Sequence, residues 1–234
     1  MRAAYRVLVR TQLTRGRMIT LAIVGLLGLL LALAIRSEDS LDPVSQAYGF
    51  ADRFGMGLLV PVVSLVFAAA SLGDLTEDGT LVYLWLRPVA RWRIAAASLA
   101  ATMTAVVPFG ILPTVLAAAV AGGDSDVIVA TAAAASLAAT AYVALFVGFG
   151  LVVQRALAWG LVYLLIWEGF VARGGRGPAR LSVLVYARSV LARLADVTPP
   201  ELAASMGVAV AVPLLIALAA ALFTTWRLRE ATVA

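Results

Sequence analysis

The sequence predicts an all-α integral membrane protein with six transmembrane helices, and three observations support this fold class. Hydrophobic residues make up 63% of the 234 residues, whereas an ordinary globular chain is about half apolar. Only 13% of the residues are charged, and these gather in short clusters between long uncharged runs, which is the pattern of membrane spans. A soluble fold has too little polar surface to cover so much apolar area, so lipid is the expected solvent.

The residue types that are missing exclude several function classes. The chain has no Cys and no His, and all 18 of its basic residues are Arg. It therefore has no thiol nucleophile, no Ser-His-Asp triad and no histidine-ligated metal site. Without Lys it has no standard P-loop, so any nucleotide hydrolysis must come from a partner. We expect no catalytic residue, no metal and no cofactor in this chain.

The first 17 residues are predicted to form a helix on the cytoplasmic membrane surface. Arg2, Arg6, Arg10 and Arg17 fall on one side of a helical wheel, where their guanidinium groups would meet lipid phosphates. The alternative is a plain polar tail that only obeys the positive-inside rule. Residues 18–234 are then one six-helix transmembrane domain.

Uncharged runs give the predicted spans. The first run is about 27 Å long as a helix, which is enough to cross the hydrocarbon core. It is longer than the apolar region of a signal peptide, so we interpret it as an uncleaved anchor. The predicted spans are residues 18–35, 54–73, 94–121, 127–153, 156–171 and 206–226.

The connections carry most of the charge. Residues 36–53 are interpreted as an acidic outer loop, and residues 122–126 as a tight outer turn. Pro108 and Pro113 predict a kink in the third span, because proline removes a backbone donor.

The fifth span is short, and the segment after it is polar. Residues 172–205 are expected to be external or re-entrant, with a helix over residues 181–195. Glu168 lies near the outer end of the fifth span. Two roles for it stay open, a structural ion pair with Arg173 or a place in a transport pathway.

Small residues recur at every fourth position of the fourth span and predict close helix packing. They are Ala132, Ser136, Thr140, Ala144 and Gly148.

Arginine placement predicts the orientation. With both termini in the cytoplasm, eleven arginines fall on the inner side, and the first two outer loops hold only Arg36 and Arg53. The third outer segment breaks the rule with five arginines. Because the arginines flank apolar spans rather than form a separate basic domain, the net charge of +5 does not indicate nucleic-acid binding.

The inner connection between the second and third spans carries a motif. Residues 74–93 read DLTEDGTLVYLWLRPVARWR. The acidic start favours a helix N-terminus, and the proline ends the helix. The expected product is a short helix across the cytoplasmic mouth of these two spans.

This segment resembles the hallmark of type-2 ATP-binding-cassette (ABC) exporter permeases, an acidic residue shortly before Gly-Thr-Leu followed by apolar residues, Pro and Arg. The order of elements along the whole chain is also similar. Where the family often has two acids one residue apart, this chain has Leu75 and Glu77, with Asp74 as the substitute. The matching residues are Glu77, Gly79, Thr80, Leu81, Pro88 and Arg91.

The resemblance implies a transport subunit of the bacterial plasma membrane. An ATPase subunit, which holds ATP and Mg²⁺, would dock on the coupling helix. A second permease subunit, identical or not, would complete the pathway. The apolar, Ala-rich spans suit a lipidic, amphipathic or drug-like cargo.

Two other function classes fit the sequence less well. A stand-alone secondary transporter usually has internal repeats and ionisable residues at mid-depth, and the predicted spans show neither. An intramembrane enzyme would have to rely on paired carboxylates, and none pair within the predicted spans.

Overall fold

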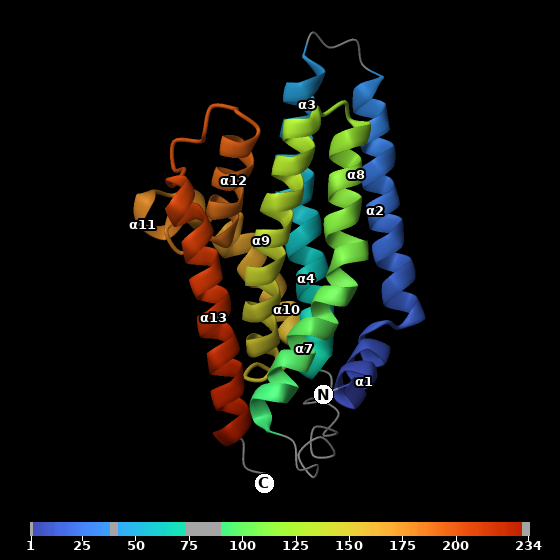
Figure 1. The fold of residues 1–234 in the computed structure, drawn as a ribbon, viewed down its shortest axis with the longest axis vertical. Coiled ribbons are helices and arrows are strands. Elements are labelled where there is room, and N and C mark those ends of the chain that lie inside the picture. The colour runs from blue at the N-terminus through green and yellow to red at the C-terminus, as the bar shows by residue number, and fades with distance from the viewer. Residues whose placement is uncertain (1, 38–41, 74–89, 231–234) are drawn as a thin grey trace.

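The computed structural model describes residues 2–37, 42–73 and 90–230, and within these residues all regular structure is helical. Figure 1 shows the helices side by side in an elongated bundle. The α- and 3₁₀-helices are α1 (Arg2–Gln12), α2 (Arg15–Arg36), α3 (Pro43–Phe50), α4 (Val60–Ala68), α7 (Arg91–Val106), α8 (Leu112–Val120), α9 (Ser125–Gly150), α10 (Ala156–Val162), η5 (Val171–Arg173), α11 (Arg176–Ala179), α12 (Val183–Leu194) and α13 (Met206–Glu230). The π-helical segments are η1 (Ala51–Leu59), η2 (Ala69–Gly73), η3 (Val107–Ile111) and η4 (Tyr163–Glu168).

Five helices in the described residues are long and apolar enough to cross a membrane. They are Arg15–Arg36, Pro43–Gly73, Arg91–Val120, Ser125–Gly150 and Met206–Glu230. The all-α fold is therefore confirmed for this part of the chain, with five helices that could cross a membrane. The predicted fifth span is instead the shorter apolar helix Ala156–Glu168.

The helix before the first span is present but shorter than predicted. α1 ends at Gln12, and Thr14 is extended, with φ −77° and ψ 145°, before α2 begins. Arg17 therefore lies in the first turn of α2, so placing it in one helix with Arg6 and Arg10 was wrong. The break turns α1 against α7, where Leu8 and Gln12 are fully buried.

The second long helix begins eleven residues earlier than predicted. The side chain of Asp42 accepts a hydrogen bond from the Ser45 backbone N–H at 3.0 Å, and Pro43 occupies the first turn, which is a favourable helix start. The helix then runs to Gly73 without a break. The predicted outer loop up to residue 53 was wrong, and Asp52 and Arg53 lie inside the helix.

The third long helix is interrupted where its prolines predict. It changes to π-helical geometry over η3, which contains Pro108, and Pro113 opens α8. The tight turn before α9 is also confirmed. Gly122 has a φ of +99°, which favours glycine, and Asp124 caps α9 by accepting a hydrogen bond from the Val127 N–H at 2.9 Å.

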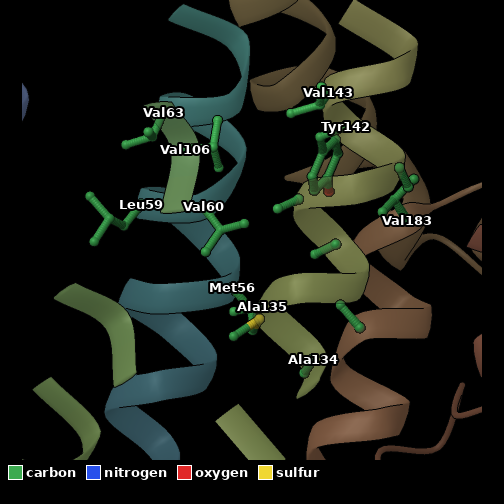
Figure 2. Packing of buried hydrophobic residues seen from close by; sticks show 14 of the residues in the cluster. Met56, Leu59, Val60, Val63, Val106, Ala134, Ala135, Tyr142, Val143 and Val183 are labelled. Carbon is green, nitrogen blue, oxygen red and sulfur yellow. The ribbon is translucent and has the colours of Figure 1, made fainter. Parts of the chain in front are cut away.

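The core lies between the second long helix and α9. Figure 2 shows Met56 of η1 and Val60 of α4 on the side of their helix that faces Ala135 of α9. Tyr142, deeper along α9, is fully buried. In contrast, α2 and α13 keep large apolar side chains exposed along much of their length, as expected of surfaces that face lipid or another membrane helix.

The predicted ladder of small residues packs along only part of α9. Ala144 and Gly148 are buried, whereas Ser136 is exposed. At Gly148 the partner helix is α13, because an added Cβ would lie 3.0 Å from Thr224 Oγ1. Gly148, at the C-terminal end of the ladder, therefore packs against α13.

Replacing Gly148 by leucine should destabilise the α9–α13 contact. Overpacking of this kind costs about 1–3 kcal/mol, and thermal unfolding of the purified protein measures it. The matched control is Gly207→Leu in the first turn of α13, where nothing lies within 4 Å of an added Cβ. Equal stability of the two variants would contradict the packing described for Gly148.

Several short helices lie between α9 and α13, and α10 and α12 are among them. Figure 1 shows α10 beside the lower half of α9 and α12 beside its upper half. α12 confirms the helix predicted over residues 181–195, and most of its residues are buried. α10 begins after Arg155, which has the left-handed φ of 57°.

Candidate functional sites at the two ends of the bundle

The end of the bundle that carries α1 is the attachment point of the predicted coupling segment. Asp74, Glu77, Gly79, Thr80, Leu81 and Pro88 lie outside the described residues. Arg91 is described and opens α7, with Ala90 as its N-cap. Figure 1 places the start of α7 beside the last turn of α13, and hydrogen bonds place α1 next to the second half of α7.

Both described ends of this segment are packed tightly against the bundle. On one side Gly73 closes η2, and a Cβ added to Gly150 would lie 3.3 Å from the Gly73 backbone N. On the other side Ile94 of α7 packs with Leu228 of α13 in a buried cluster. A displacement of the segment would therefore reach α9, α7 and α13 directly.

Hydrogen bonds join α1 to α7, the helix that follows the predicted coupling segment. The Tyr5 hydroxyl is 2.8 Å from Thr104 Oγ1, and Gln12 Nε2 donates to Thr102 Oγ1 at 3.2 Å. Arg6 and Arg10 are exposed. α1 thus packs on α7 through one face and presents these guanidinium groups outward.

Glu168 is a buried helix cap. Its side chain is 4% exposed and lies at the N-terminus of α12. Its carboxylate accepts hydrogen bonds from the Val183 N–H at 3.0 Å, the Leu184 N–H at 3.4 Å, the Tyr163 hydroxyl at 3.1 Å and the Ser182 hydroxyl. A carboxylate at a helix N-terminus is stabilised by the free N–H groups and by the helix dipole. This geometry favours a structural role for Glu168. The carboxylate is held by these hydrogen bonds rather than by the predicted ion pair with Arg173. A place for Glu168 in a transport pathway stays a prediction.

A charged hollow towards the other end of the bundle was not foreseen from the sequence. The Arg188 Nε lies 2.7 Å from Asp52 Oδ1, so a salt bridge joins α12 to η1. Both side chains are about one-fifth exposed. Together with Arg53 and Glu201 they line a hollow of about 680 Å³. The signal that could have found it is Asp42-Pro43, which starts the helix early enough to include Asp52.

Breaking the Asp52–Arg188 salt bridge from one side should cost more than removing both charges. Asp52→Asn and Arg188→Gln each remove one side of a partly buried salt bridge, whereas the double variant removes both charges. We expect a coupling free energy of about 1–3 kcal/mol in a double-mutant cycle of thermal or denaturant unfolding. Additive single effects would contradict the pairing.

Among the described residues, no group of three or more Asp or Glu side chains is placed to hold a metal ion. Comparison with models of protein families finds no match. Comparison with curated proteins also finds no match.

Proposed function

We propose that this chain is the membrane-spanning permease subunit of an ABC exporter, driven by ATP hydrolysis in a separate subunit. The observation that carries the proposal is the segment over residues 74–93, which combines Glu77, the Gly79-Thr80-Leu81 run, Pro88 and Arg91. The absence of a P-loop lysine from the sequence requires that ATP and Mg²⁺ bind to the partner.

The architecture supports this proposal. Five helices in the described ranges are long and apolar enough to cross a membrane. The shorter apolar helix Ala156–Glu168 would cross part of it, and α12 would continue towards the outer side. α1 would lie at the cytoplasmic surface with Arg6 and Arg10 among lipid head groups. Both termini would be cytoplasmic, and the bacterial plasma membrane is the proposed location.

The packing at the end of the bundle that carries α1 supports a route by which motion of the ATPase would reach the spans. A docked ATPase would move the coupling helix when it closes on ATP. Because Gly73 contacts the Gly150 backbone closely and α7 packs on α13, the motion would pass to several spans at once. A second permease subunit, the same chain or a related one, would enclose the pathway against the exposed faces.

Purification from native membranes tests the proposal. The expected result is a complex with a P-loop ATPase whose ATP hydrolysis changes when this chain is bound. Recovery of the chain alone, with a native ATPase neither bound nor stimulated, would overturn it.

A stand-alone secondary transporter is the second candidate, and one observation favours it. Asp52 lies inside the second spanning helix, where the sequence predicted no acid, and intramembrane acids often carry coupling protons. The salt bridge to Arg188 holds this carboxylate in a structural contact instead. Cargo transport driven by a proton gradient, in liposomes that contain only this chain, would establish this alternative.

A further inference from the structure

Arg53 is an exposed arginine within a membrane-spanning helix. It is the eleventh residue of Pro43–Gly73, which places it about 15 Å along the helix from its start. It lies in η1, and π-helical segments inside α-helices are frequent at functional sites. No hydrogen bond or salt bridge joins the Arg53 side chain to another described residue. An arginine inside a membrane span is costly and often marks a ligand or pathway.

Two hollows of opposite character meet at Arg53. On one side lies a mainly apolar groove of about 580 Å³, between the end of α2 and the start of the second long helix. Its lining includes Ile35, Gly49, Phe50 and Leu58. On the other side lies the charged hollow of about 680 Å³ that contains the Asp52–Arg188 salt bridge. Both volumes are in the range of small-molecule sites.

The groove has rigid walls. The rings of Phe50 and Phe54 are stacked, with centroids 5.1 Å apart. A Cβ on Gly28 of α2 would clash with the Phe54 ring, so this ring is seated against α2. The groove is therefore preformed, which lowers the cost of ordering a bound apolar chain.

The charged hollow favours an anion. Asp52 and Arg188 neutralise each other, which leaves the positive charge of Arg53 at the junction with the groove. Glu201 also lines the adjoining hollow, together with Arg176 and Arg180. Arg53 is the charged side chain in the lining of the apolar groove, so the charge where the groove meets the charged hollow is positive.

We propose that Arg53 and the two hollows form a binding site for an amphiphile with an anionic head group. The head group would pair with the Arg53 guanidinium, and its apolar tail would lie along Phe50 and Leu58. The binding site stands on its own geometry; that its ligand is the cargo class rests on the proposed function.

Comparing an anionic with a zwitterionic lipid tests whether the Arg53 charge binds the head group. The full chain in a non-ionic detergent, without nucleotide or ATPase, is titrated with lysophosphatidylglycerol whose acyl chain carries a fluorophore, and anisotropy reports binding. Lysophosphatidylcholine with the same tail should bind about tenfold more weakly, since it lacks the net charge. Arg53→Gln should remove this difference, and Arg53→Lys should retain most of it. Arg36→Gln, an exposed arginine that lines neither hollow, is the matched control.

A variant that fills the apolar groove tests whether the lipid tail binds there. An added Cβ at Gly49 meets nothing within 4 Å, so Gly49→Leu is expected to fold and to occupy the groove. It should weaken binding of both lipids about tenfold, while the control Gly207→Leu leaves binding unchanged. Inorganic phosphate should not compete at concentrations where the lipid does.

Three results would each overturn the site. They are equal affinity for the two lipids, unchanged affinity in Arg53→Gln or Gly49→Leu, and competition by phosphate alone. The proposed function fails on a different result, the absence of an ATPase partner, so the two failures are distinguishable. If binding holds and no ATPase is found, Arg53 marks a lipid site in a protein of another function.

Discussion

Replacing Glu168 by alanine is expected to lower the free energy of unfolding by about 3 kcal/mol, one of the two largest effects predicted here. The carboxylate accepts bonds from the Val183 N–H and from the hydroxyl groups of Tyr163 and Ser182. Alanine would leave these buried donors without an acceptor and would remove the negative charge at the start of α12. Thermal unfolding in detergent measures the loss.

Two further variants make the Glu168 test specific. Glu168→Gln keeps one acceptor oxygen, so it should lose roughly half as much stability. Glu230→Ala removes an exposed acid at the end of α13 and should change stability by less than about 0.5 kcal/mol. A loss in Glu168→Ala no larger than in this control would show that the cap does not stabilise α12.

Replacing Glu77 by alanine or Gly79 by valine is expected to reduce transport and ATP hydrolysis about tenfold or more, while the complex with the ATPase stays assembled. Coupling free energies between sites are typically about 1–3 kcal/mol, which corresponds to this range. The reason is that these residues belong to the proposed contact with the ATPase subunit. The measurements are ATPase activity of the complex and cargo transport in proteoliposomes.

The control for the coupling segment is Val89→Ala, which lies in the same segment outside the matched pattern. It should retain activity near that of the unmodified chain. Glu77 and Gly79 variants that assemble and transport normally would count against a coupling role for the segment.

The long helices could be predicted from the sequence because lipid imposes a simple rule on them. An uncharged run of sufficient length must satisfy its backbone groups internally and so becomes a helix. This rule located α2, the helix Arg91–Val120, α9 and α13 to within a few residues. Local chemistry located the breaks as well, since Pro108 coincides with the π-helical segment and Gly122 with the turn.

The start of the second long helix was mispredicted for a physical reason. Asp52 and Arg53 are charged, and their charges predict the end of a loop, because a charge inside a span is costly. Arg188, 136 positions further along the chain, pairs with Asp52 and reduces that cost. Such a pairing depends on tertiary packing, which neither hydropathy nor charge counting represents. The local signal at Asp42-Pro43 was present but carried less weight than the charges.

The role of Glu168 shows the same limit. Its position near the outer end of a span left a pathway role and an ion pair equally open. The deciding contacts come from Ser182, Val183 and Leu184, fourteen to sixteen residues away across two short helices. Only the fold shows that the free N–H groups of α12 lie beside this carboxylate.

Site-directed cross-linking from the coupling segment is the most direct test of the claim that a separate ATPase subunit moves this bundle. The chain has no cysteine, so Asp78→Cys introduces its sole thiol between Glu77 and Gly79. In native membranes, a short thiol-to-amine cross-linker at this position should capture an ATPase subunit with a P-loop, and ATP should change the yield. A control thiol at Gly207, on the first turn of α13, should capture no ATPase. Transport-competent protein whose Asp78→Cys thiol reaches no nucleotide-binding subunit, with or without ATP, would contradict the account.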